Sequence, residues 1–282
     1  MTETRLAILG AGVMGTAIAT LATGRGLPVT LVDTDRSKVD AAAGSVRQQL
    51  RLAQLMGKLP RTGTPGELTV TATPDLSDAT VVVEAVTELA ELKAKVLTDV
   101  SAAVAPGTLL VTNTSAIPVD ELANAAAHPT DLLGIHFMNP PYLIRTVEVI
   151  RGPRTGDAAL AAATDLLTAL DLHGVVVGDG PGFVINRILQ RMINEAARIV
   201  EDGIATPEQV DELFRGCLGH QTGPLATADL IGLDNVVDSL RVLHERTGDE
   251  SYRPCGALTA KVAAGEHGRK TGQGFYEHGG VA

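Results

Sequence analysis

Three glycines after a short apolar segment constrain this chain more than any other feature. The apolar residues 6–9 precede a G-x-G-x-x-G spacing made by Gly10, Gly12 and Gly15. In a turn from strand to helix, the first glycine permits a tight bend, the second lets the backbone approach a pyrophosphate, and the third lets the helix pack on the strand. The predicted helix begins at Val13 and Met14, and its unpaired N–H groups would face the phosphates. The motif predicts a dinucleotide site.

A second apolar segment, residues 29–32, ends at Asp33, eighteen residues after Gly15. A carboxylate at the end of the second strand binds the ribose hydroxyls of the adenosine half. It would also repel a 2′-phosphate, so the sequence favours NAD over NADP. Arg36 lies three residues later and offers the competing interpretation, a 2′-phosphate contact. The other alternative is a structural turn with an Asp that caps a strand.

Composition excludes several function classes. The 282 residues carry a net charge of −10 and only 2% aromatic side chains, so the basic field and the stacking surfaces of nucleic-acid binding are missing. No apolar run reaches the roughly 18–20 residues that span a bilayer, and an apolar strand begins too early for a signal peptide. The two cysteines, Cys217 and Cys255, have no metal-ligand spacing. We expect a cytoplasmic protein without metal, membrane or nucleic-acid partner.

Up to about Gly180, apolar segments alternate with helical ones, which predicts an α/β fold. The expected architecture is a Rossmann-type, doubly wound, mostly parallel sheet with helices on both faces. One helix is expected over residues 89–104, because Pro106 and Gly107 follow it. The expected strands are residues 6–9, 29–32, 81–83, 109–111, 132–135, 147–150 and 175–177.

The pattern changes after the glycine-rich residues 178–182. Residues 185–200 carry an apolar stripe with helical spacing, and further helical patterns begin at Pro207 and near Thr227. We therefore expect a Rossmann domain over residues 1–180 and a smaller all-helical domain over residues 181–282.

Five segments in order make the chain similar to the 3-hydroxyacyl-CoA dehydrogenase family. This resemblance implies an NAD-binding domain, a helical substrate domain that forms a homodimer, and oxidation of a 3-hydroxyacyl thioester to the 3-oxoacyl thioester. The segments are Asn113-Thr114-Ser115, His136-Phe137-Met138-Asn139-Pro140, Glu148, residues 181–187 (PGFVINR) and residues 268–276 (GRKTGQGFY).

The chemistry of such an oxidation requires a base beside the hydroxyl group. His136 follows the expected strand 132–135, at the C-terminal end where ligands bind in open α/β sheets, and Glu148 comes from the neighbouring extended segment. A carboxylate on the far imidazole nitrogen would fix the tautomer and stabilise the imidazolium. The family gives this pair that role, and by resemblance Ser115 and Asn186 bind the substrate oxygens. Taken alone, a histidine at a strand end is more often a surface or core residue than a catalyst, and the same holds for Glu148.

The resemblance also implies cofactor contacts beyond the glycine loop and Asp33. It places Glu88 and Lys93 beside the nicotinamide ribose, although Leu89 stands where the family usually has Asn. Ser115, Asn139 and Lys270 match further contact positions. The alternatives are a loop cap for Asn139 and a solvated charge for Lys270.

Two segments differ from the usual sequence of the family in regions that bear on the substrate. After Asn139-Pro140 the chain has Pro141-Tyr142, similar to relatives that oxidise polar hydroxy acids, such as gulonate and carnitine dehydrogenases. Tyr142 would place a hydroxyl near the reacting group. The coenzyme A clamp of the family shortens to residues 50–66, where Arg51 and Lys58 would meet the phosphates of coenzyme A or the acidic face of an acyl carrier protein. No acidic residue occurs from 41 to 66, and the alternative is a solvated helix face.

Three hypotheses follow. The first is NAD-dependent oxidation of a short-chain 3-hydroxyacyl-CoA. The second is the same chemistry on a small polar acyl group of the glyceryl type, carried by an acyl carrier protein in polyketide extender-unit biosynthesis. The third is a dinucleotide-binding protein without turnover, which has no physical need for His136, Glu148, Ser115 and Asn186 together.

Overall fold

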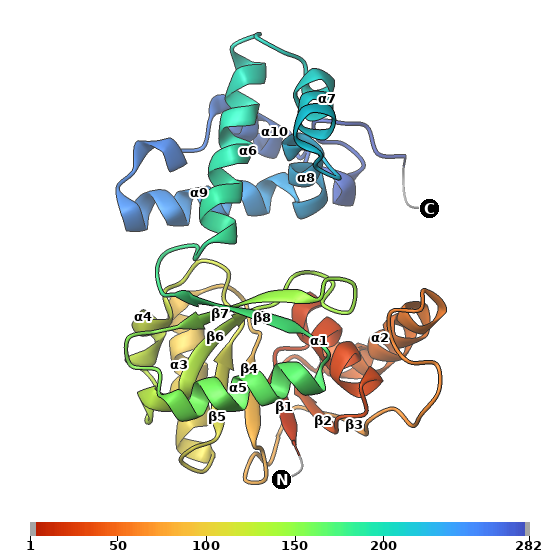
Figure 1. Ribbon diagram of the computed structural model, residues 1–282, viewed down its shortest axis with the longest axis vertical. Coiled ribbons are helices and arrows are strands. Elements are labelled where there is room, and N and C mark those ends of the chain that lie inside the picture. Colours follow the sequence, from red (N-terminus) through yellow and green to blue (C-terminus); the bar gives the residue numbers. More distant parts are fainter. Residues whose placement is uncertain (1–3, 280–282) are drawn as a thin grey trace. The chain divides into compact units, whose positions relative to one another are not determined.

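The computed structural model describes residues 4–279 (Figure 1). The chain divides after Gly180 into two compact units, the first comprising the sheet with its helices and the second comprising helices. Within the described residues, no helix is long and apolar enough to cross a membrane.

The first unit is built on one sheet of eight strands. All neighbouring strands run parallel except β6 and β7, which are antiparallel. This mostly parallel, doubly wound sheet confirms the expected fold class. The order across the sheet is β3 (Leu68–Thr71), β2 (Val29–Val32), β1 (Leu6–Leu9), β4 (Val81–Glu84), β5 (Leu109–Thr112), β6 (Leu132–His136), β7 (Thr146–Arg151) and β8 (His173–Gly178).

Helices cover both faces of this sheet because the central strands are apolar on both sides. Alternate strand residues such as Ile8 and Val83 share a core with α1 (Val13–Gly24), α2 (Arg36–Leu55) and α5 (Asp157–Ala169). The opposite face carries α3 (Ala90–Ala103) and α4 (Val119–Ala123), which pack together and contact β4 and β6. A Cβ atom on Gly134 would lie only 2.9 Å from the side chain of Val119, so β6 and α4 approach closely.

Seven expected strands are confirmed, with small differences at their ends. The strand β3 was not expected, because it has only two apolar residues and lies only partly buried at the edge of the sheet. Its four residues alternate between apolar and threonine side chains, but a segment this short between Pro65-Gly66 and Pro74 gives a weak periodic signal. The expected helix over residues 89–104 is α3, and Leu89 is its N-cap.

The second unit contains five α-helices in its described part. The expected helices from 185 and from Pro207 are confirmed, and the one expected near Thr227 begins three residues earlier, at Pro224. Their buried faces form one apolar core. The helices are α6 (Ile185–Glu201), α7 (Pro207–Leu218), α8 (Pro224–Ile231), α9 (Leu233–Thr247) and α10 (Gly256–Ala263).

Two buried carboxylates hold the C-terminal segment to these helices. Asp211 on α7 accepts hydrogen bonds from the backbone N–H groups of Leu225 (2.9 Å) and Ala226 (2.8 Å), at the start of α8. It also accepts the hydroxyl of Tyr276 at 2.8 Å. Asp229 on α8 accepts the backbone N–H groups of Phe275 and Tyr276, both at 2.9 Å. These bonds satisfy backbone N–H groups at the start of α8 and hold Phe275 and Tyr276 against the helices.

Burial, together with the hydrogen bond to Asp211, raises the pKa of Tyr276. A tyrosine whose pKa is higher in the folded than in the unfolded state stabilises fully below the unfolded value of about 10, and this stability is lost as the pH rises further. We expect Tyr276→Phe to lower the free energy of unfolding at pH 8 and to make its decline above pH ~10 shallower. Urea unfolding from pH 8 to 11 measures both. An unchanged slope would show that Tyr276 does not contribute.

Candidate active site

The glycine loop joins β1 to α1, and each glycine meets different surroundings. Gly10 has φ +102°, and a Cβ atom there would lie 2.6 Å from the carbonyl oxygen of Ala85. A Cβ atom on Gly15 would lie 1.7 Å from the carbonyl oxygen of Gly10. At Gly12, by contrast, a Cβ atom would meet no described atom within 4 Å. Packing therefore explains the first and third glycines, whereas the second keeps a space open.

This space lies at the start of α1. Gly12 is the N-cap and offers no side-chain hydrogen bond to the first N–H groups of the helix. A cavity of about 560 Å³ adjoins it, lined by Gly10 and Gly12, by Asp33 after β2, and by residues 85–87 after β4. Uncapped N–H groups beside an open cradle match the needs of a pyrophosphate. The first unit thus fits the dinucleotide that the sequence predicts.

Asp33 connects the end of β2 to the glycine loop. Its carboxylate accepts the backbone N–H of Ala11 at 2.8 Å and that of Asp35 at 2.9 Å. The ammonium of Lys38 lies 3.8 Å away. Asp33 therefore has a structural role as well as the predicted ribose contact, since it holds the loop against the strand end.

A buried charge network lies behind the loop after β4. The ammonium of Lys93, fully buried on α3, contacts Glu84 at 2.8 Å, Glu88 at 3.2 Å and the carbonyl oxygen of Val86 at 3.2 Å. Glu84 also accepts the hydroxyl of Thr112 at 2.7 Å. The buried ammonium of Lys93 has two carboxylates and a carbonyl oxygen as partners, so its charge is compensated. These contacts hold the loop after β4 in place. The structure shows Lys93 as a support for Glu88, and its predicted contact with the cofactor stays a prediction.

Glu88 links two strand ends. One carboxylate oxygen accepts the hydroxyl of Thr114 (2.5 Å) and the backbone N–H groups of Ser115 (2.7 Å) and Ala116 (3.2 Å). Glu88 follows β4 and Ser115 follows β5, so the network places both at the carboxyl end of the sheet, where ligands bind in this architecture. The sequence placed both residues near the cofactor without indicating that they contact each other.

His136 and Glu148 form a direct cross-strand pair. In the antiparallel register of β6 and β7, His136 lies opposite Glu148. The distance between His136 Nδ1 and Glu148 Oε2 is 2.8 Å, and both residues are buried. An ionised Glu148 requires the proton on Nδ1, which leaves Nε2 as the basic nitrogen. The pair has the geometry of an oriented general base.

The loop after His136 contains the next predicted residues. The backbone N–H of Phe137 donates to the Asn113 side chain at 3.1 Å, which ties this loop to the end of β5. Asn139 is exposed, whereas Tyr142 packs partly against the core, and burial raises the pKa of its hydroxyl. The contacts predicted for Asn139 and Tyr142 remain predictions.

Two predicted residues belong to the second unit. Asn186 lies in the first turn of α6, and Lys270 lies in the short 3₁₀ helix Arg269–Thr271. The ammonium of Lys270 contacts Asp234. Burial opposes ionisation of Asp234, but the hydrogen bond and charge of Lys270 outweigh it and lower the pKa of this carboxyl. The structure thus gives Lys270 an ion pair within its own unit.

The basic residues predicted to meet the carrier lie near the C-terminal end of α2. Arg51 and Lys58 are exposed, and neither forms an ion pair with any residue of the described chain. Arg61 differs, because its guanidinium donates to the carbonyl oxygens of Gln54 (2.7 Å) and Leu55 (2.6 Å) and thereby caps the helix. Charge at Arg51 and Lys58 is therefore available to a ligand.

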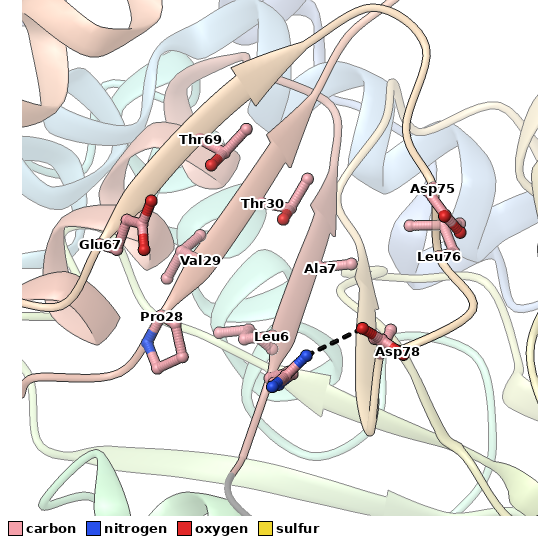
Figure 2. A pocket seen from close by; sticks show the side chains of 12 residues that line it. Leu6, Ala7, Pro28, Val29, Thr30, Glu67, Thr69, Asp75, Leu76 and Asp78 are labelled. Carbon is pink, nitrogen blue, oxygen red and sulfur yellow. Dashed lines mark hydrogen bonds and ion pairs between the residues drawn. The ribbon is translucent and has the colours of Figure 1, made fainter.

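A further cavity lies at the opposite, amino-terminal end of the strands (Figure 2). Its volume is about 420 Å³, and Thr30 of β2 and Thr69 of β3 line it. The ion pair of Arg5 with Asp78 (2.9 Å) crosses one side. None of the predicted site residues borders it, so this cavity is separate from the nucleotide loop.

Comparison with known proteins decides the family. Residues 5–180 match the profile of the 3-hydroxyacyl-CoA dehydrogenase NAD binding domain, and residues 182–278 match the C-terminal domain of the same enzymes. This chain belongs to the 3-hydroxyacyl-CoA dehydrogenase family. It is therefore an NAD-dependent oxidoreductase, which confirms the expected cofactor.

Individual members of the 3-hydroxyacyl-CoA dehydrogenase family resemble the chain over nearly its whole length. It is 38% identical over 277 residues to a probable 3-hydroxybutyryl-CoA dehydrogenase of Deinococcus radiodurans, covering 97% of this chain and 100% of that protein. It is 36% identical to a 3-hydroxybutyryl-CoA dehydrogenase of Bradyrhizobium diazoefficiens, covering 98% and 96%. The crystal structure of (S)-3-hydroxybutyryl-CoA dehydrogenase from Ralstonia eutropha superposes with a TM-score of 0.89 at 35% identity, covering 99% and 100%.

Sequence reasoning missed several residues of the site. No role was assigned to Glu84 from the sequence, yet this residue is fully buried and anchors Lys93. Thr112 and Thr114 at the end of β5 complete the network. A glutamate within an otherwise apolar strand was the available signal, because a buried carboxylate requires partners.

The open space at Gly12 generates the first test of the cofactor site. We expect Gly12→Ala to fold, with a loss of less than about 1 kcal/mol at the N-cap. The added methyl occupies the cradle, so NAD affinity should fall at least about tenfold, or ~1.4 kcal/mol. Gly44→Ala on α2 is the matched control, because its Cβ also meets no described atom within 4 Å. Equal NAD affinity of both variants, measured by calorimetry, would refute the cradle.

Asp33→Asn tests cofactor choice. Its amide oxygen can still accept the Ala11 N–H, while the charge that repels a 2′-phosphate is removed. We expect the preference for NAD over NADP, measured as the ratio of kcat/KM values, to fall about tenfold, as for loss of one charge contact. An unchanged ratio with an unchanged melting temperature would remove Asp33 from cofactor selection.

Proposed function

We propose that this enzyme oxidises the 3-hydroxyl group of a short-chain 3-hydroxyacyl-CoA to the 3-oxoacyl-CoA. The observation that carries the proposal is the buried contact of 2.8 Å between His136 and Glu148, at the carboxyl end of the sheet that holds the nucleotide loop. The names of the 3-hydroxybutyryl-CoA dehydrogenases to which the chain is 36–38% identical support the short acyl chain.

In this proposal His136 is the general base. Its Nε2 takes the proton of the substrate hydroxyl while the carbonyl forms, and the bound nicotinamide supplies the acceptor for the hydrogen of C3 with its electron pair. Glu148 holds the Nδ1 proton and stabilises the imidazolium that results. The proton then leaves Nε2 for solvent.

The other predicted residues bind and orient. Ser115 and Asn186 hydrogen-bond the substrate oxygens, and Asn186 stabilises negative charge on the thioester side. Glu88 and Lys93 fix the loop that borders the nicotinamide ribose, with Asn139 and Lys270 as further cofactor contacts. The hydrogen bond from the Ser115 backbone N–H to Glu88 supports placing these two residues together beside the cofactor.

A second candidate differs in the substrate alone. It is a small polar acyl group of the glyceryl type on an acyl carrier protein, as in polyketide extender-unit biosynthesis. Tyr142 supports it, because this half-buried residue lies in the loop after His136 and its hydroxyl would suit a polar acyl group. The unpaired charges of Arg51 and Lys58 suit an acidic carrier surface.

Two further parts of the proposal concern the whole protein. The helical unit forms the homodimer, and the enzyme acts in the cytoplasm. Exposed apolar side chains on the helical unit support the homodimer. Ile188 is 64% exposed, Leu213 58% and Leu230 61%.

Substitution of the base tests the mechanism. We expect His136→Gln to lower kcat about 10²- to 10⁴-fold, because proton transfer loses its acceptor. Glu148→Gln should also lower kcat, since it no longer fixes the imidazole charge and tautomer. NAD affinity and melting temperature serve as controls and should change little. Retained turnover in a folded His136→Gln variant would refute the assignment, and absent turnover in the wild type on every thioester would favour a binding protein.

The choice of substrate is a separate measurement. Initial rates of NAD reduction are compared on 3-hydroxybutyryl-CoA and on a glyceryl group loaded on an acyl carrier protein. A much higher kcat/KM on the CoA ester is the expected result. Preference for the carrier-bound group would replace the first candidate by the second and make Tyr142 a specificity residue.

A further inference from the structure

The first turn of α2 carries two cations close to Asp33. Arg36 and Lys38 are the first and third residues of this helix, and no residue of its fully described first turn is acidic. The N-terminus of a helix has a partial positive charge, so cations at this end lower the stability of the helix. The charges of α2 are thus placed unfavourably for the helix itself, and an anionic ligand beside this turn would explain them.

Lys38 belongs to the nucleotide cavity. It lines the cavity of about 560 Å³ together with Asp33 and Thr34. The Lys38 ammonium lies 3.8 Å from the Asp33 carboxylate, and its side chain is 49% exposed. At this distance the two charges attract each other without a hydrogen bond, so the ammonium keeps its N–H donors for a ligand.

The other cations near the cavity differ from Lys38. Arg36 is exposed and has no side-chain partner among the described residues, but it does not line the cavity. Lys95 on α3 does line the cavity, but its ammonium contacts Asp99 of the same lining at 2.6 Å. Lys38 is therefore the cation of the cavity whose hydrogen-bond donors are available within the described residues.

Asp33 does not present an uncompensated negative charge to the cavity. One carboxylate oxygen accepts the backbone N–H of Ala11 at 2.8 Å, and the other accepts that of Asp35 at 2.9 Å. Residues 33–38 contain two carboxylates and two cations, so this segment has no net charge. The repulsion by which an acidic residue excludes a 2′-phosphate is therefore offset here.

We propose that Lys38 gives the enzyme a second cofactor, NADP, by binding the 2′-phosphate of its adenosine half. NAD stays the preferred cofactor, because Asp33 still opposes the phosphate. The reaction is the same with both: the hydrogen of C3 passes with its electron pair to the nicotinamide, and the hydroxyl proton passes to His136. The 3-oxoacyl thioester and the reduced cofactor result.

Binding of NAD and NADP in the absence of substrate tests the contact without turnover. The two cofactors differ only in the 2′-phosphate. We expect dissociation constants within about tenfold of each other for the wild type, because an uncompensated like charge would separate them by at least about 10². Lys38→Gln should weaken NADP about tenfold, as for loss of one charge-assisted contact, and change NAD by less than about twofold. Calorimetry measures all four constants.

Two further variants separate this contact from a general effect of charge. Lys95→Gln is the matched control, because it removes a lysine of the same cavity that is paired with Asp99. Arg36→Gln removes the neighbouring cation that does not line the cavity. Each should change NADP affinity by less than about twofold. An equal loss of NADP affinity in Lys38→Gln and Arg36→Gln would overturn the specific role of Lys38.

Kinetics and stability give independent readouts. With 3-hydroxybutyryl-CoA as substrate, Lys38→Gln should lower kcat/KM for NADP about tenfold through KM and leave kcat unchanged, because the contact is remote from the reacting atoms. The melting temperature should not fall, since the substitution removes a cation from the N-terminus of α2. A lower melting temperature with equal losses for NAD and NADP would give Lys38 a structural role and contradict the proposal.

The outcomes distinguish this inference from the proposed function. A wild type that binds NAD at least about 10² more tightly than NADP would overturn the second cofactor and leave the oxidation intact. Binding of both cofactors without turnover of any thioester would support the Lys38 contact and contradict the proposed function. Binding of neither would overturn the nucleotide cradle and this inference with it.

Discussion

The antiparallel pairing of β6 with β7 is the constraint on which the site depends. Among the named strands of residues 4–279 it is the single antiparallel contact, and it places His136 directly opposite Glu148. A slip by one residue would move each side chain to the other face of the sheet. The buried apolar residues on both sides of the pair, such as Ile135 and Val149, oppose such a slip. Core packing thus fixes the contact between His136 and Glu148.

The same sheet edge carries a second fixed arrangement. Lys93 is buried between Glu84 and Glu88, and Glu88 holds the turn that contains Ser115. Removing one member of such a network would leave a buried charge without a partner, which costs more than the pair itself contributes. The loop after β4, the turn that contains Ser115, and His136 are therefore each held by contacts with the ends of strands.

Much of this could be predicted from the sequence, for local reasons. The glycine spacing, the acidic residue at Asp33 and the alternation of apolar segments are properties of neighbouring residues, and they predicted the fold class and the nucleotide loop. The strand β3 was not predicted because it has only four residues, of which two are apolar, and so gives a weak periodic signal. The sequence also did not predict the ion pairs of Lys93 with Glu84 and of Asp171 with Arg25. The residues of each pair are brought together by the order and twist of the strands.

The central claim is that hydrogen passes from C3 of the substrate to NAD while His136 takes the hydroxyl proton. One measurement tests it directly: a single turnover of 3-hydroxybutyryl-CoA deuterated at C3, with mass analysis of the reduced cofactor. The account predicts one deuterium in the reduced cofactor with the wild type, at a rate that His136→Gln lowers by at least about 10². Reduced cofactor without deuterium, or an equal rate in the folded variant, would contradict it.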